Sequence, residues 1–515
     1  MRLTSCIAAV SLLPAMALAQ GTFNLDKSTA GTVGSNLVVR VGNAPANSVV
    51  LLMASTTSGP TPISLYDPND TRVLDVGTEL SANWPVLVSD ASGAVQYSLA
   101  VPNDPTLANV VLSWQSATPG TVSLVGPISN SIRTQLSIAG TSLLAPATLA
   151  TPRSIAAAFP DPNENAGAGD FLLAGGGGGS LTGGLGLQTS EFWDFRRMTT
   201  RPGPNLSTGR ALALAVRLAD GRMLLTGGTD ATGAATATCD LYDPVTNTFT
   251  ATGSMATARA LHAAVRLADG RVMVAGGTSS LLDQTSIITN VLSSVEFWNP
   301  ATGAWTNGPA IGGRRLAPAL TRLPDNRVLV TGGVQVGFLF GVPISASSIN
   351  ATQFWNPATN AWTNGPPMSI GRAGHHFNQV TLSDGRTLFT GGIVVTDLLN
   401  AANAAPTPVC DFFNPTFGTF QNAGLMPTAR ILHTATVLPN GNVVLCGGAQ
   451  GTLSATVSVN AVSLFDPVNF VWSALPPLQV ARSAHATAVM PDGTLVLLGG
   501  QGLVGPEASI ETLRF

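Results

Sequence analysis

Paired glycines at a regular spacing constrain the fold of this chain more than any other feature. The pairs recur 49 to 59 residues apart through the C-terminal two thirds, within one repeated order of signals. Each unit has an Arg, a run of small residues, a turn of the Asp-Gly type, a run ending in Gly-Gly and an aromatic residue before Asn-Pro or Asp-Pro. A period near 50 indicates one supersecondary unit repeated around or along an axis. The pairs begin at Gly175, Gly227, Gly276, Gly332, Gly391, Gly447 and Gly499.

The third repeat shows how one unit divides into strands. Asp269-Gly270 separates two apolar runs and is typical of a tight hairpin, while Ala301-Thr302-Gly303 predicts a second turn. We therefore expect four antiparallel strands in each unit. In the third repeat they are residues 259–267, 271–277, 294–300 and 304–308.

These features resemble the Kelch repeat, and they are also similar to the central domain of galactose oxidase. The resemblance implies an all-β fold, a seven-bladed Kelch-type β-propeller over residues 139–515. The last repeat stops at Phe515 before a fourth strand, so we expect residues 139–144 to supply that strand and close the ring. Each of the seven repeats begins with an Arg. In chain order these are Arg153, Arg210, Arg259, Arg315, Arg372, Arg430 and Arg482.

The N-terminal part of the chain has a different organisation. Residues 1–19 have an early Arg, an apolar run and the small residues Ala17 and Ala19, a pattern that predicts a signal peptide cleaved after Ala19. The mature protein is therefore expected to be secreted or periplasmic. Residues 20–138 contain short runs with partial alternation, bounded by turn residues, and predict a small, Ig-like β-sandwich domain.

Composition excludes several classes of partner. Charged residues make up 10% of the chain and the net charge is -3, so no broad field favours nucleic acid or an anionic membrane. After the signal sequence, no apolar stretch is long enough for a membrane span. Cys239, Cys410 and Cys446 lack the spacing of a zinc site or a disulfide framework. We expect no cofactor, and no feature of the sequence indicates whether the protein forms oligomers.

The loops between the second and third strands of each repeat point to a binding face. In an antiparallel blade these loops share one face with the connections between blades. They are longest and most apolar in three consecutive repeats, at residues 278–293, 334–351 and 393–408. The segment Phe338-Leu339-Phe340 favours a partner-binding surface, because exposed apolar patches mark such sites. The alternative is that these loops fold down onto their own blades.

The repeated arginines and histidines each allow two interpretations. An Arg in every blade fits inter-blade hydrogen bonding, while the resemblance implies that a subset could receive carboxylates at the channel mouth, as in Kelch domains that bind acidic peptides. His262, His433 and His485 follow the Arg by three residues, and His375 and His376 lie at the same place in their blade. Since this Arg-x-x-His pattern resembles the ordinary Kelch repeat, we expect no metal site.

Catalysis has little support in the sequence. The resemblance to galactose oxidase implies a copper held by two Tyr and two His, but the propeller region contains the single tyrosine Tyr242. No nucleophile elbow, phosphate loop or HExxH motif is present. We expect an exported binding or scaffold protein with a protein or glycan partner and no catalytic residue. The alternatives are a secreted carbohydrate-active or oxidase-like enzyme with a site at the channel mouth, or a structural protein of the cell envelope.

Overall fold

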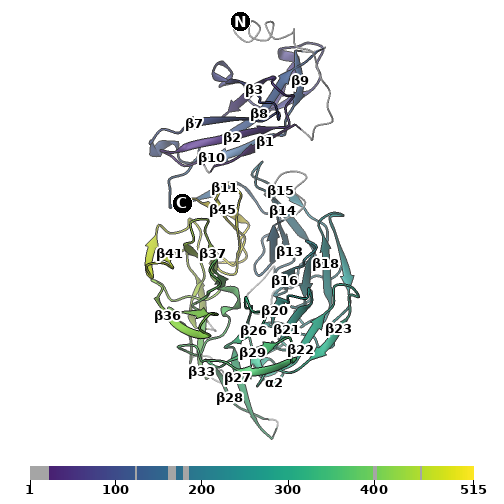
Figure 1. Cartoon of the computed structure of the whole chain (residues 1–515), viewed down its shortest axis with the longest axis vertical. Helices are drawn as coiled ribbons and strands as arrows, with labels where there is room; N and C mark the ends of the chain where they lie inside the picture. Colours follow the sequence, from purple (N-terminus) through teal and green to yellow (C-terminus); the bar gives the residue numbers. More distant parts are fainter. Residues whose placement is uncertain are drawn as a thin grey trace.

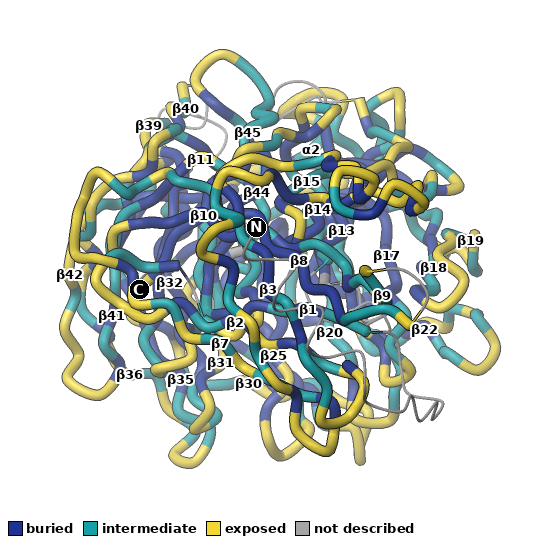
Figure 2. Tube along the Cα trace, turned by 90° about the horizontal axis from the view of Figure 1, so that it is seen from above, coloured by how far each residue is buried: buried dark blue, intermediate teal, exposed yellow. Residues whose placement is uncertain are grey.

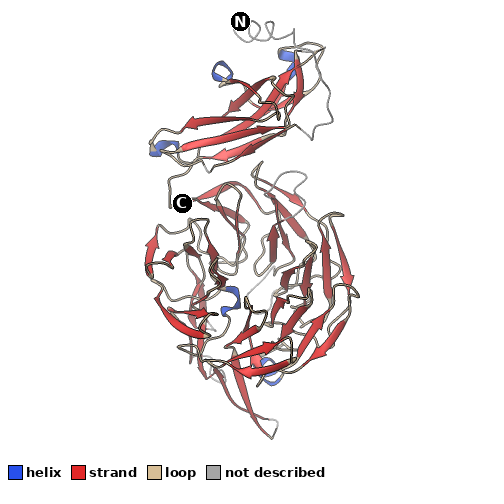
Figure 3. Cartoon of the chain, viewed as in Figure 1, coloured by secondary structure: helices blue, strands red, loops and turns tan. Residues whose placement is uncertain are grey.

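The chain folds almost entirely into small antiparallel β-sheets (Figure 3). The computed structural model describes residues 23–29, 31–121, 124–160, 170–177, 185–340, 342–397, 403–452 and 455–515. The expected signal peptide lies outside these ranges. Among the described residues, no helix is both long enough and apolar enough to cross a membrane.

Two sheets at the N-terminal end enclose one apolar core. Their orders are β1-β2-β7 and β10-β8-β3-β6, and β9 pairs with β8. Leu37, Val39 and Val41 alternate along β2 and pack with Trp114 of β8 in a buried cluster drawn from both sheets. The strands are β1 (Asn24–Lys27), β2 (Asn36–Gly42), β3 (Val49–Ser55), β4 (Ser58–Pro62), β5 (Val73–Val76), β6 (Val86–Val88), β7 (Val95–Ala100), β8 (Val111–Pro119), β9 (Val125–Ile128) and β10 (Ile132–Gln135). Short 3-10 helices span Ile63–Leu65, Ser81–Asn83 and Pro105–Leu107.

The repeats form seven four-stranded antiparallel sheets, numbered here in chain order. Sheet 1 has β12 (Ala157–Pro160), β13 (Asp170–Ala174), β14 (Ser190–Asp194) and β15 (Thr199–Pro202). Sheet 2 has β16 (Leu214–Arg217), β17 (Met223–Thr226), β18 (Cys239–Asp243) and β19 (Thr248–Thr252). Sheet 3 has β20 (Ala263–Arg266), β21 (Val272–Ala275), β22 (Val295–Trp298) and β23 (Trp305–Gly308).

The remaining four sheets have the same strand order, and sheets 4, 5 and 6 have extra strands inserted between their second and third strands. Sheet 4 has β25 (Ala319–Arg322), β26 (Val328–Thr331), β29 (Thr352–Asn356) and β30 (Ala361–Asn364). Sheet 5 has β31 (Gln379–Thr381), β32 (Thr387–Thr390), β35 (Val409–Asn414) and β36 (Thr419–Leu425). Sheet 6 has β37 (Thr434–Val437), β38 (Val443–Cys446), β41 (Val462–Asp466) and β42 (Val471–Leu475). Sheet 7 has β43 (Ala486–Val489), β44 (Leu495–Leu498), β45 (Ser509–Leu513) and β11 (Ser142–Thr148).

Sheet 7 combines strands from distant parts of the sequence. Ser142 and Leu143 of β11 pair with Leu513 and Thr512 of β45, so a segment before the first repeat supplies the outermost strand. The sequence expectation was residues 139–144, and the strand covers Ser142–Thr148. This pairing gives the exposed edge of β45 a partner, as every other third strand in the ring has.

The seven sheets stand in a ring with their first strands innermost (Figure 1). Neighbouring first strands contact each other, and β12 contacts both β16 and β43. Between β25 and β31 the link is a hydrogen bond of 2.8 Å from Gln379 Nε2 to the Leu320 carbonyl. Apolar clusters fill the spaces between adjacent sheets, as in the cluster of Met273, Val330 and Trp355. The second strands, such as β21 and β44, are buried along their whole length, and Figure 2 colours the chain by burial.

The paired glycines form the joints between sheets. Gly276 and Gly277 have φ of 66° and 88°, a region that favours glycine. The N–H of Gly277 donates to the carbonyl of Arg315 in the next sheet at 2.9 Å, and the corresponding bond recurs at five other joints. Since a Cβ on Gly276 would overlap that same carbonyl, the joint leaves no room for a side chain.

The N-terminal sheets lie beside the ring, next to β11, β14 and β15 (Figure 1). Lys27 Nζ donates to the carbonyls of Arg133 and Phe195 at 3.0 and 3.1 Å, and Asp26 pairs with Arg196 at 3.2 Å. Arg514, after β45, donates to the carbonyl of Gln135. Phe195 and Arg196 belong to the turn between β14 and β15, so this contact lies on the side of the ring opposite the long loops.

Candidate functional site

The seven repeat arginines lie inside the ring, each 0–1% exposed. Arg259 is representative: its Nη1 donates to the carbonyls of Gly276 and Ser294, at 3.1 and 3.2 Å. These acceptors lie directly after the second strand and directly before the third strand of its own repeat. The guanidinium group therefore bonds within its own repeat, while the hydrogen bond to the preceding sheet is accepted by the main-chain carbonyl of the Arg.

A buried acid on the third strand accompanies most of these arginines. Arg259 Nη2 lies 2.5 Å from Glu296, and the corresponding distances to Asp240 and Asp411 are 2.6 Å. The carboxylate also accepts from the linker that precedes the Arg, as Glu296 does from the N–H of Ala256 at 2.6 Å. In sheets 1, 2, 3 and 5 the acid is two residues before the aromatic of its repeat, a spacing that could have revealed it in the sequence, whereas Glu511 of sheet 7 precedes Leu513.

Two sheets have no acid at this place. Gln353 occupies it in sheet 4, and Ser463 in sheet 6 accepts from Arg430 at 2.8 Å. Burial lowers the pKa of Arg315 and of Arg430 to about 10. Because all seven guanidinium groups are enclosed, none lies on a surface that a carboxylate partner could reach, and the second interpretation of the Arg ring does not describe them.

Four histidines join neighbouring sheets. His262 Nε2 lies 2.9 Å from Thr226 Oγ1, and His433 lies 2.8 Å from Thr390; in both pairs the threonine belongs to the preceding sheet. His375 and His485 form the same contact with Thr331 and Thr434. Burial, and then the neighbouring Arg charge, lowers the pKa of these four histidines well below 6.5. Among the described residues, no group of His, Cys, Asp or Glu is placed to hold a metal ion.

The long loops form a second layer of structure over sheets 3 to 6. Loop 278–293 contains α2 (Gln284–Thr289), and β27 (Val334–Leu339) pairs with β28 (Val342–Ser348) and with β24 (Arg315–Leu316). The pairs β33 (Ile393–Asp397) with β34 (Asn403–Pro406) and β39 (Ala449–Thr452) with β40 (Ala455–Ser458) continue the layer. Because α2 contacts β28, β28 contacts β33 and β34 contacts β39, the loops support one another.

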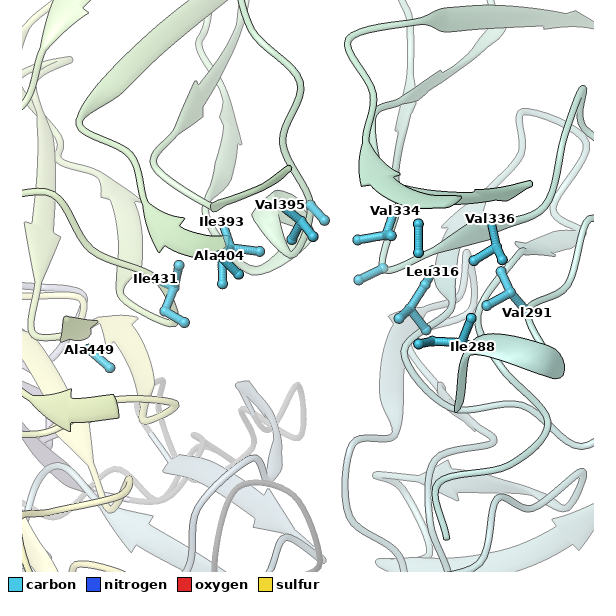
Figure 4. Close-up of a cluster of buried hydrophobic side chains, with 13 residues drawn as sticks. Ile288, Val291, Leu316, Val334, Val336, Ile393, Val395, Ala404, Ile431 and Ala449 are labelled. Carbon is cyan, nitrogen blue, oxygen red and sulfur yellow. The ribbon is translucent and has the colours of Figure 1, made fainter. Parts of the chain in front are cut away.

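Most apolar residues of this layer are turned inward. Ile288 and Val291 pack near Leu316, Val334 and Val336, and a second group gathers around Ile393, Val395 and Ile431 (Figure 4). The alternative that the loops fold down onto the ring therefore describes most of their apolar surface.

The tip of the β27–β28 hairpin is the largest exception. Phe340 is 97% exposed, and Leu339, Val342 and Ile344 are 53 to 60% exposed. The base of the same hairpin is anchored, because Val334 and Val336 are buried and Arg314 stacks on Phe338 with 4.6 Å from its guanidinium carbon to the ring centroid. Of the expected segment, Phe338 is thus held in the layer while Leu339 and Phe340 are presented to solvent.

Comparison with known proteins gives a fold and no family. No family model matches the chain, and no curated protein matches it. The similar solved structures include a fungal alcohol oxidase of the AA5 family in complex with copper, with a TM-score of 0.53 and 16% identity over 72% of this chain and 75% of that one. At this identity the likeness concerns the fold alone.

The residues present do not fit a copper centre of the oxidase kind. Tyr242 is fully buried between Phe159 and Phe249, and its hydroxyl lies 3.1 Å from Asn247 Oδ1. The four joint histidines each contact a threonine rather than one another. Cys239, Cys410 and Cys446 are free and buried, and burial raises the pKa of Cys239 to about 11 and of the other two to about 12.

Proposed function

We propose that this chain is an exported binding or scaffold protein that recognises a protein or glycan partner with one face of a ring. In this proposal residues 139–515 form a seven-bladed propeller of the Kelch type, and residues 20–138 form an Ig-like β-sandwich. The repeated Arg and His residues hold the ring together. The partner contacts the loop layer, chiefly the hairpin tip that contains Leu339 and Phe340.

The exposed tip of the β27–β28 hairpin carries this proposal. An apolar cluster in water is unfavourable by about 25 cal/mol per Å² of exposed apolar surface, so an exposed cluster of this kind favours a partner that covers it. The neighbouring loops bury their apolar residues in the same layer, which shows that this region can enclose such side chains. The tip residues are the largest group of exposed apolar side chains in the layer, in which Leu282 and Val457 are also exposed.

Replacing Phe340 and Leu339 by Ser tests the proposal. We expect the double variant to fold normally, because both side chains are exposed, and to lose the partner captured by the unmodified protein from its native extracellular fraction or on a glycan array. Phe417→Ser is the matched control, since Phe417 is 77% exposed in the turn between β35 and β36, on the opposite side of the ring. Equal binding by the double variant and the unmodified protein would exclude the hairpin tip.

The second candidate is an oxidase-like enzyme, and it is supported by the likeness to the AA5 alcohol oxidase. Its site would lie at the channel mouth and would need residues other than a Tyr-His copper set. Oxygen consumption by the purified protein over a panel of alcohols and sugars tests this candidate. A structural role in the cell envelope is distinguished by fractionation, because such a protein would remain with the envelope.

A further inference from the structure

Three arginines end the innermost strands of three consecutive sheets. Arg217 is the last residue of β16, Arg266 of β20 and Arg322 of β25. They lie at the turn between first and second strands, on the side of the ring opposite the loop layer. Because β20 contacts both β16 and β25, the three positions are neighbours on that side of the ring.

Strand alternation gives the three side chains the same direction around the ring. Along β20, Ala264 packs in the cluster between sheets 2 and 3, and Val265 packs in the cluster between sheets 3 and 4. Arg266 shares the side of Ala264 and therefore faces sheet 2. Arg322 shares the side of Leu320, which packs in the cluster with sheet 3, so it faces the end of β20. Arg217 and Arg322 are exposed and Arg266 is partly exposed.

These three guanidinium groups have no partner among the described residues. No hydrogen bond or ion pair joins them to any of these residues, whereas the aspartate of each adjoining turn is engaged by another arginine. Asp220 pairs with Arg222 and Asp269 with Arg271, both at 2.7 Å, and Asp325 pairs with Arg327 at the same distance. Among the residues that the structure describes, each of the three turns therefore carries one arginine without an acidic partner.

The repeat itself does not require arginine at this position. The corresponding residue is Thr381 in sheet 5, Val437 in sheet 6 and Val489 in sheet 7, and those sheets have the same four strands. Like charges at neighbouring positions are unfavourable unless an anion lies between them. The arginines are therefore not explained by the packing of the ring.

We propose that Arg217, Arg266 and Arg322 form a binding site for a ligand that carries several oxyanion groups, on the side of the ring opposite the loop layer. The planar guanidinium fork matches carboxylate and phosphate oxygens in a bidentate manner. Adjacent inner strands repeat this fork from sheet to sheet, so the ligand is a chain or cluster of anionic groups rather than a single ion. The site is separate from the hairpin tip.

Calorimetric titration of the purified full chain with two probes tests the proposal. Tripolyphosphate represents phosphate ligands, and a short oligogalacturonate represents carboxylate ligands. We expect at least one probe to bind, more weakly as salt increases. Each single change to Gln (R217Q, R266Q or R322Q) should weaken binding about tenfold, and the triple variant should show no measurable binding.

Arg40→Gln is the matched control, because it makes the same change in net charge on an exposed residue of β2, in the N-terminal sheets. It should bind like the unmodified protein. The proposal is overturned if neither probe binds, if the triple variant binds as well as the unmodified protein, or if R40Q weakens binding as much as a single variant of the site. The unfolding curves of the single variants are measured as well. If they match the curve of the unmodified protein, weaker binding is not caused by a loss of folding.

Discussion

At the residue scale, the charged groups of the repeat act in the interior. Removing water from a guanidinium group is costly unless hydrogen bonds and an opposite charge replace it. The ring supplies both, since Arg259 donates to two carbonyls and pairs with Glu296. The sequence reveals the recurrence of the Arg, but the acid changes between Asp and Glu and is absent from two repeats. Because the residue that pairs with the Arg differs from repeat to repeat, it is difficult to recognise from sequence spacing alone.

The buried histidines make stability depend on pH. Burial holds their pKa well below 6.5 in the folded protein, while the unfolded chain has the ordinary value. Below about pH 6.5 the unfolded chain therefore binds more protons than the folded one, and the free energy of unfolding falls as the pH falls. Each buried His contributes up to about 1.4 kcal/mol per pH unit, and this limit is approached well below pH 6.5. We expect urea unfolding between pH 6.5 and 5 to show this dependence.

His433→Gln should reduce that slope by about one proton, because it removes one titrating group at the contact with Thr390. The variant also loses some stability at neutral pH, which is measured separately. An unchanged slope in the variant would mean that His433 is not protonated differently in the two states.

At the element scale, local sequence patterns predict the strands. The joints between sheets depend on how neighbouring sheets pack in the ring, which local patterns do not specify. The expected strand 271–277 contains β21, and the expected strands 294–300 and 304–308 contain β22 and β23. The first strand was expected from Arg259 but begins at Ala263, because Leu261 has φ of 52° and interrupts the extended backbone. The hairpins inside the long loops were not foreseen, since their apolar residues pair across three different repeats.

The joint glycines allow a direct test of this difference. Gly276→Ala should be strongly destabilising, because the new Cβ would overlap the Arg315 carbonyl of the next sheet. Gly270→Ala is the control: its φ of 89° imposes the backbone strain of a left-handed residue, but its Cβ would meet no atom closer than 3.8 Å. We expect the control to cost about 1 kcal/mol and Gly276→Ala several times more, in urea unfolding. Equal losses would mean that close contact between sheets is not what selects the glycine.

At the scale of the whole molecule, a single lysine lies where the N-terminal sheets meet the ring. Lys27 is 2% exposed, and its ammonium lies 3.6 Å from the centroid of the Phe195 ring. Sequence composition shows that Lys27 is the one lysine of the chain, but not that it is buried. That position depends on how two separately organised parts of the chain pack together, which no local pattern specifies.

Lys27 is the one lysine side chain of the protein. The rate at which an amine-reactive reagent labels the peptide containing Lys27 therefore reports on this contact. Burial lowers the pKa of Lys27 to about 8, so at pH 8.5 much of it is deprotonated and chemically reactive. We nevertheless expect slow labelling, because reaction requires the N-terminal sheets to move away from Phe195. Peptide mass spectrometry should show the rate rising sharply in urea and in the variant Arg196→Ala, which removes the ion pair to Asp26 at the same contact. Arg201→Ala, which removes an ion pair to Asp170 within sheet 1, should leave the rate unchanged. Rapid labelling of the unmodified protein in buffer would mean that the two parts separate freely in solution.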